Sequence, residues 1–96
     1  MAKSSENSEM AGKAEKEIGI VTNYYAHVGA MAIKLKAPLK VGDTIRVKGG
    51  EHTDFEQKIE SMQIDRREVN QAKAGDEIGI IASEKVRKDY KVLKVS

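Results

Sequence analysis

The sequence predicts a small all-β domain, a closed antiparallel β-barrel of six strands. The first observation behind this prediction is the pattern Lys-x-Gly-Asp-x-Ile, which occurs at residues 40–45 and again at 73–78. Glycine adopts a positive φ without steric cost, and aspartate bonds its own local backbone, so each copy is expected to be a tight turn that starts a strand. The second observation is the alternation of apolar and polar residues in segments such as 43–48, which is typical of a strand with one face in water.

Composition indicates one small domain with a lean core. The chain has 96 residues, of which 40% are hydrophobic and 33% charged, and its net charge is +2. It contains no cysteine, which excludes disulfides and thiolate metal sites. The first 17 residues lack the apolar centre of a signal peptide, and no stretch approaches the roughly 18 apolar residues of a membrane span. We therefore expect a cytoplasmic protein with no membrane partner.

The expected organisation is a tail followed by a single β domain. Residues 1–16 are rich in Ser, Glu, Lys and Ala and are expected to be disordered, because they contain little to bury. The β domain is expected to span residues 17–96. Alternation in its first strand places Ile18 and Ile20 on one face and Val21 on the other. Six strands are expected, at residues 17–25, 28–35, 43–48, 53–65, 76–82 and 90–95.

The fourth expected strand changes phase midway. Phe55, Gln57 and Ile59 fall on odd positions, whereas Met62 and Ile64 fall on even positions. A bulge near Glu60–Ser61 would let both halves point inward, and such a bend is how a long strand turns the corner of a barrel. The alternative is an amphipathic helix, because the apolar residues of this segment also fit helical spacing.

The order of these motifs resembles the second domain of translational GTPases such as elongation factor Tu, which is a β-barrel. The similarity covers residues 17–96 and is closest to small stand-alone translation elongation factor-like proteins. A similar barrel is found at the C-terminus of some peptidase-like proteins of the U32 class. The segments that carry the resemblance are Gly19-Ile20-Val21, Val28 to Leu35, Pro38 to Ile45, Phe55 to Ile64 and Ala72 to Ile80.

The resemblance implies a binding module for RNA or a ribonucleoprotein, such as tRNA or the ribosome. The chain lacks the pattern Gly-x-x-x-x-Gly-Lys-Ser/Thr of a phosphate-binding loop, so GTP hydrolysis is not expected. No nucleophile elbow accompanies its serines, so we expect a protein that is not an enzyme and has no cofactor. The alternative, suggested by the U32-class proteins, is an accessory barrel that docks on an enzyme partner. We expect a monomer in either case.

Basic residues supply the candidate RNA-binding site. If they converge on one face, their charges could neutralise phosphates, and whichever of Tyr24 and Tyr25 faces outward could stack on a base. The alternative is an ordinary solvated surface whose lysines keep strand edges from aggregating. The candidate RNA-binding residues are Lys36, Lys40, Arg46, Lys48, Lys85, Arg87 and Lys88.

The remaining candidates are predicted to be structural or solvated. Turn chemistry fully explains the two Gly-Asp pairs, Gly42–Asp43 and Gly75–Asp76. His27 has no ligand-type residue near it in sequence. His52 has neighbouring carboxylates at Glu51 and Asp54, which is a weak pattern for a metal site, and a solvated loop is the expected reading.

Overall fold

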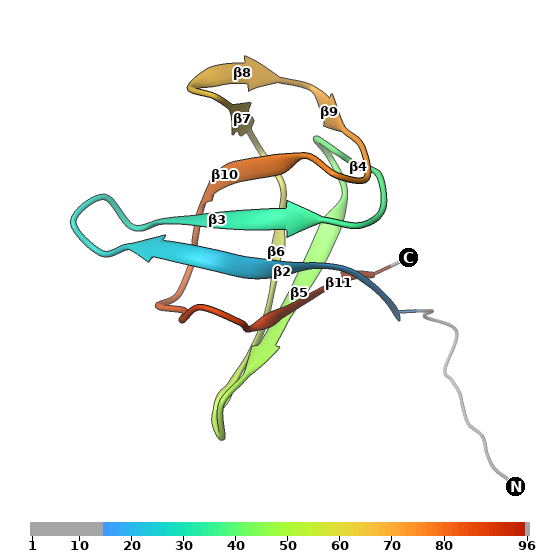
Figure 1. Ribbon diagram of the computed structural model, residues 1–96. Helices are drawn as coiled ribbons and strands as arrows, with labels where there is room; N and C mark the ends of the chain where they lie inside the picture. Colours follow the sequence, from blue (N-terminus) through green and yellow to red (C-terminus); the bar gives the residue numbers. More distant parts are fainter. Residues whose placement is uncertain (1–14, 96) are drawn as a thin grey trace, which may run out of the picture.

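The computed structural model describes residues 15–95, and this part of the chain is built from β-strands (Figure 1). Eight strands form one antiparallel sheet in the order β6-β5-β11-β2-β3-β10-β7-β8, and β4 pairs with β9 in a separate ribbon. Of the expected disordered tail, residues 1–14 lie outside the described residues, whereas Glu15 and Lys16 already belong to the first strand. The strands are β2 (Glu15–Tyr25), β3 (Ala30–Leu35), β4 (Leu39–Lys40), β5 (Thr44–Gly49), β6 (Thr53–Lys58), β7 (Met62–Ile64), β8 (Arg67–Val69), β9 (Gln71–Ala72), β10 (Glu77–Ile81) and β11 (Lys91–Val95).

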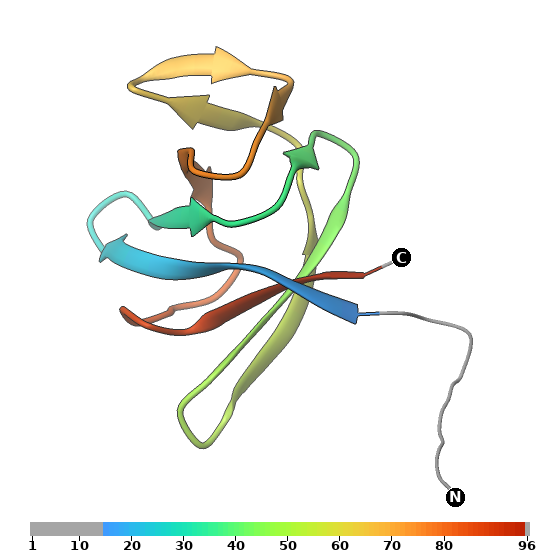
Figure 2. The ribbon, with the colours of Figure 1, turned by 45° about the vertical axis from the view of Figure 1, so that its right-hand side comes forward.

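The all-β, antiparallel prediction is confirmed, but the closed barrel of six strands is wrong. The sheet curls strongly, and the continuous segment 53–64 contributes strands near both ends of the strand order (Figures 1 and 2). Its first half, β6, pairs with β5, and its second half, β7, pairs with β10 and β8. No strand pairing joins β6 to β10, and residues 59–61 between β6 and β7 belong to no strand. The pairing therefore stays open along a line between β6 and β10, which we call the seam.

The phase change in segment 53–64 is where the sequence predicts it. Ile59 and Met62 are both buried, while Glu60 and Ser61 between them are exposed. The two exposed residues take up the change of parity, so that both halves of the segment point inward. The helical alternative is excluded, since β-strands flank the break on both sides.

One apolar core lies inside the curled sheet. In β3 the side chains of Met31, Ile33 and Leu35 are buried, and Lys34 between them is exposed, as alternation predicts. Among the described residues no polar or charged residue is buried. The core consists of Ile18, Val21, Met31, Ile33, Leu35, Leu39, Ile45, Val47, Phe55, Ile59, Met62, Ala72, Ile78, Ile80, Val86 and Val92.

The alternation expected for β2 is wrong, because the strand contains two bulges. Its register against β11 shifts at Ile18, and its register against β3 shifts at Thr22. Each extra residue reverses the parity that follows it. As a result Ile18 and Val21 are both buried, and Ile20 lies on the outer face.

The two Gly-Asp motifs form matching turns, as predicted. Gly42 has a φ of 100° and Gly75 a φ of 97°. In the first turn, the Asp43 N–H donates to the Lys40 carbonyl at 3.1 Å, and the Asp43 carboxylate accepts the Lys40 N–H at 3.0 Å. The second turn repeats both bonds three residues apart, with Asp76 at 3.0 Å in each case. A bond from residue i+3 to i with positive-φ glycine at i+2 is the signature of a type II turn.

Candidate functional site

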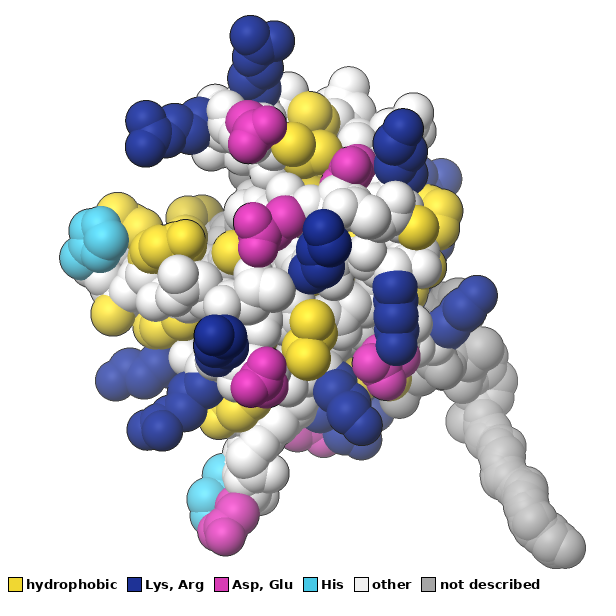
Figure 3. Space-filling model, in the orientation of Figure 1, with side chains coloured by type: hydrophobic (Ala, Val, Ile, Leu, Met, Phe, Trp, Pro, Cys, Tyr) yellow, Lys and Arg dark blue, Asp and Glu magenta, His cyan; other side chains and the backbone are white. Residues whose placement is uncertain are grey.

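Exposed apolar side chains gather at one end of the sheet. Among the described residues, the exposed large hydrophobics are Tyr25 at 43%, Val28 at 57% and Ile81 at 63% exposure. Tyr25 and Ile81 both stand in register with Ala30, so these three side chains share the outer face of β2, β3 and β10. We call Tyr25, Val28, Ala30 and Ile81 the hairpin-end patch. Figure 3 shows apolar side chains clustered at this end of the molecule.

The turn between β2 and β3 holds the patch in place. The N–H groups of Val28 and Gly29 both donate to the Tyr25 carbonyl, at 3.1 and 2.9 Å. Gly29 has a φ of 69°, which an L side chain rarely adopts. Its carbonyl accepts the Ala82 N–H at 2.8 Å and so ties the end of β10 to the turn. These three bonds fix the backbone of the turn, and the Val28 side chain remains in solvent.

A basic loop borders the patch beside the end of β2. Val86 is buried and anchors this loop, whereas Lys85, Arg87 and Lys88 on either side of it are exposed. These three cations form no ion pair with another residue of the described range 15–95. Together with Asn23, Tyr24 and Ala26 the loop lines a shallow groove of about 540 Å³. Tyr24 is opposite Met31 on the inner face, so Tyr25 is the outward tyrosine.

The seven predicted RNA-binding residues do not form one surface. β3 and β10 are antiparallel, so Lys36 and Lys40 follow the end of β3 that lies farthest from Ile81, after which the basic loop begins (Figure 1). Lys85, Arg87 and Lys88 therefore lie at the opposite end of the sheet from the turn at Lys40. The sequence could not show this, because it does not reveal which strand ends meet.

Within residues 15–95, two of the seven cations form ion pairs. Lys36 donates to Glu17 at 2.9 Å, and this hydrogen bond lowers the pKa of Glu17 below its usual value. Arg46 binds Asp54 through two nitrogens, at 2.6 and 2.7 Å, and this bidentate contact likewise lowers the pKa of Asp54. Lys48 stands beside Lys91 on the outer face of β5 and β11.

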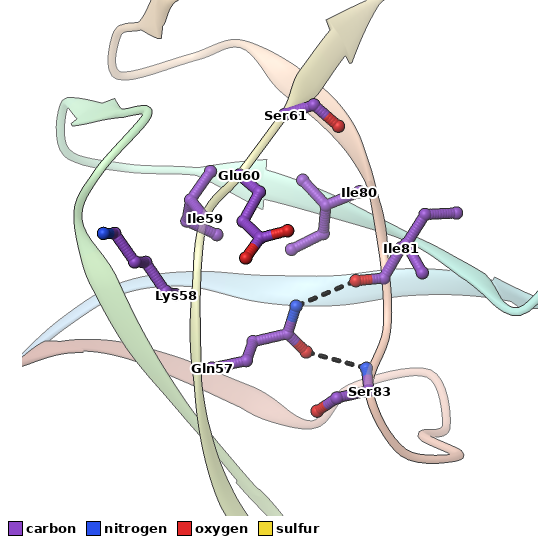
Figure 4. A pocket seen from close by; sticks show the side chains of 8 residues that line it. All are labelled: Gln57, Lys58, Ile59, Glu60, Ser61, Ile80, Ile81 and Ser83. Atoms are coloured by element: carbon purple, nitrogen blue, oxygen red, sulfur yellow. Dashed lines mark hydrogen bonds between the residues drawn. The ribbon is translucent and has the colours of Figure 1, made fainter.

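A hollow of about 420 Å³ lies along the seam, and one side chain spans it (Figure 4). The Gln57 Nε2 donates to the Ile81 carbonyl at 2.8 Å, and the Gln57 Oε1 accepts the Ser83 N–H at 2.9 Å. The amide thus pairs with the backbone at the end of β10 and just after it, as a neighbouring peptide group would. Sequence reasoning missed this role, although Gln57 is the polar residue at an inward position between Phe55 and Ile59.

The described residues do not bring Glu51, His52 and Asp54 together as a metal site, the weaker of the two interpretations that the sequence left for this loop. No group of three His, Cys, Asp or Glu within residues 15–95 is placed to hold an ion. His52 Nε2 is 3.8 Å from Glu51 Oε1, and both side chains are in solvent. Asp54 is turned to Arg46 instead. The described part of the chain also has no helix that is long and apolar enough to cross a membrane.

Comparisons with known proteins give a sequence relative and a shared fold. The chain is 38% identical over 88 residues to the "Uncharacterized protease MJ0090" of Methanocaldococcus jannaschii, an alignment that covers 88% of this chain and 22% of that protein. The chain thus spans about a fifth of the length of this relative. No protein-family model matches the chain.

Two crystal structures have the same fold. Both contain the C-terminal domain of a Geobacillus thermoleovorans protein assigned to the U32 peptidases, and one is its selenomethionine variant. The variant has a TM-score of 0.76, covering 80% of this chain and 96% of that chain. The other has a TM-score of 0.77, covering 82% and 91%. Each is 18% identical to this chain, a level at which the likeness shows the fold alone.

These findings overturn the kinship with translation factors. The sequence relative is a protease, and the matching solved structures are C-terminal domains of a U32 peptidase. The predicted RNA-binding translation module is therefore wrong, and the alternative reading agrees better with the comparisons. The motifs behind the first assignment were turn and core residues, which any small curled sheet of this kind requires.

Proposed function

We propose that this chain is a non-catalytic accessory domain that docks on the catalytic part of a U32-type peptidase. The observation that carries the proposal is the 38% identity to a protease of which the chain matches only 22%. Domains of the same fold form the C-terminal part of another protein assigned to that class. In this proposal the catalytic machinery belongs to the remainder of the enzyme, and this domain contributes a binding surface.

The described side chains support a binding role rather than a catalytic one. Ser61 and Ser83 line the hollow at the seam, but both histidines of the chain lie on exposed turns elsewhere. A nucleophile needs a base within hydrogen-bond reach. The apolar core fills the interior of the sheet, and the surface hollows are open and shallow.

The proposal is tested by mixing the purified chain with the full-length U32-type peptidase of the same organism. We expect a 1:1 complex by sedimentation and calorimetry, unchanged after nuclease treatment, together with no peptidase activity in this chain alone. Failure to form a complex at about 100 μM of each protein, which corresponds to less than about 5.5 kcal/mol of binding free energy, would contradict it.

A further inference from the structure

The hairpin-end patch combines three features that the rest of the described surface does not bring together. It holds the exposed large hydrophobics Tyr25, Val28 and Ile81, the small side chain of Ala30 stands in register between Tyr25 and Ile81, and it adjoins the basic loop (Figure 3). Scattered exposed hydrophobics are normal on a monomer, whereas a group of them rimmed by polar residues marks an interaction site.

The patch has a strongly basic flank on one side only. On the side of β2, the groove beside the patch is lined by Lys85, Arg87 and Lys88. On the far side, a second groove of about 380 Å³ runs from Tyr25 to the β7–β8 hairpin. Of its charged lining, Asp76 and Glu77 stand at the far end of β10, where Glu77 is in register with Lys34, so Asp65 and Arg66 are the charges at the β7–β8 hairpin. The basic flank therefore selects a partner whose matching surface is acidic, because a basic surface would place like charges together.

We propose that the hairpin-end patch is the face by which this domain docks on the catalytic part of its peptidase, an inference that rests on the proposed function. The partner surface has an apolar centre that covers Tyr25, Val28 and Ile81. It carries carboxylates where it meets Lys85, Arg87 and Lys88. Those three cations have no acidic partner within residues 15–95, so the partner's carboxylates are the groups that complete them.

The apolar part of the patch is smaller than a whole interface between proteins. A stable interface between free proteins buries about 800 Å² on each side. Three exposed apolar side chains supply only the centre of such an interface. The basic loop beside them adds a charged rim to that centre. The M. jannaschii relative, most of whose length lies outside the match, contains the region on which we propose that such a domain docks.

The test compares changes at the patch with matched changes at the opposite end of the sheet. The apolar variant is Val28→Ser with Ile81→Ser, and the charge variant is Lys85→Glu with Arg87→Glu. The charge control is Lys40→Glu with Lys73→Glu, two exposed lysines that each open a Gly-Asp turn through their backbone. Far-UV circular dichroism and thermal melts confirm that every variant is folded.

Binding to the full-length U32-type peptidase is measured by calorimetry at two salt concentrations. We expect each patch variant to bind at least about tenfold more weakly and the charge control to bind within about twofold of the wild type. The charge variant should also lose the salt dependence of the wild type. In the wild-type complex, amides of residues 25–30 and 81–88 should gain exchange protection, while those of 40–43 and 73–76 should not.

Other outcomes separate the two levels of the proposal. If the wild type does not bind the peptidase, the proposed function fails. If the wild type binds and the patch variants bind equally well, the function stands and the docking face is wrong. A dimer of this chain that the apolar variant abolishes would assign the patch to a second copy. Binding to vesicles of phosphatidylserine and phosphatidylcholine that the patch variants lose would assign it to a membrane surface.

Discussion

Replacing Gln57 by methionine should open the seam between β6 and β10. Methionine has the same length and an unbranched side chain, but it cannot pair with the Ile81 carbonyl or the Ser83 N–H as the glutamine amide does. A hydrogen bond contributes about 0.5–1.5 kcal/mol net, and both backbone groups lie near solvent, where water partly replaces the lost bonds. We therefore expect the free energy of unfolding to fall by about 1–2 kcal/mol. For a domain of this size that corresponds to a melting temperature about 4–16 °C lower.

The assay is urea unfolding followed by circular dichroism, with amide exchange of Ser83 as the local readout. The matched control is Gln63→Met, since Gln63 lies in the same segment with its side chain exposed and without a hydrogen bond to another described residue. Exchange at Ser83 should accelerate only in the Gln57 variant. Equal stability of the two variants within about 0.3 kcal/mol, with Ser83 exchange unchanged, would refute the bridging role.

A second variant, Gln57→Glu, separates the two bonds. Its carboxylate can still accept the Ser83 N–H, but it faces the Ile81 carbonyl without a proton. Protonation restores a donor, so the folded-state pKa of the new carboxyl should be raised above the ordinary value of about 4.3. The protonated carboxyl of Glu at position 57 stabilises the fold fully below the unfolded-state pKa of about 4.3. This stabilisation is lost as pH rises through the folded-state pKa. The deficit relative to wild type should therefore narrow on acidification, and a constant deficit from pH 7 to pH 3 would argue against this geometry.

Three further predictions concern the backbone and the surface. Gly19→Ala should destabilise the fold by about 1–3 kcal/mol in urea unfolding, because the new Cβ would lie 2.6 Å from the Lys34 carbonyl oxygen; wild-type stability would show that the strands can separate there. Gly75→Val should cost at least about 1 kcal/mol by thermal melting through its φ of 97° alone, since no atom lies within 4 Å of the added Cβ, and a neutral result would contradict the left-handed turn. Arg46→Gln should raise the pKa of Asp54 toward its usual value in an NMR titration, because the bidentate bond that lowers it is lost. In the wild type, the lowered pKa of Asp54 stabilises the fold above the unfolded-state pKa, and this stabilisation is lost as pH falls through the folded-state pKa. The variant should lack this contribution. An unchanged pKa of Asp54 would show that another group lowers it.

Local chemistry could be predicted from the sequence. The Gly42 and Gly75 turns depend on a positive φ and a nearby carboxylate, which four consecutive residues specify. The break at residues 60–61 was predictable for the same reason, since a change of parity shows directly in the pattern. The number of strands was underestimated for two reasons. The short strands β4, β8 and β9 lie in segments expected to be connections, and the fourth expected strand is divided into β6 and β7.

Features that depend on distant pairing could not be predicted in this way. A bulge adds one residue to a strand but has no characteristic amino-acid composition. The bulges at Ile18 and Thr22 were therefore not visible in the sequence, and the alternation of β2 was misassigned. The hairpin-end patch requires that Tyr25 and Ile81 stand on either side of Ala30, a register that involves three strands. The bridge of Gln57 to Ile81 likewise joins positions that only the curl of the sheet brings together.

The position of β11 has a consequence for how the chain folds. This strand is the last in the described chain, yet it lies in the interior of the sheet, between β5 and β2. Neither of those strands can complete its pairing until residues 91–95 have joined them. Loops of great length must therefore close before their contacts contribute, which makes folding slow relative to that of helical domains of equal size. Loss of these five residues would not trim an edge but divide the sheet into two parts, so we expect truncation there to abolish folding altogether.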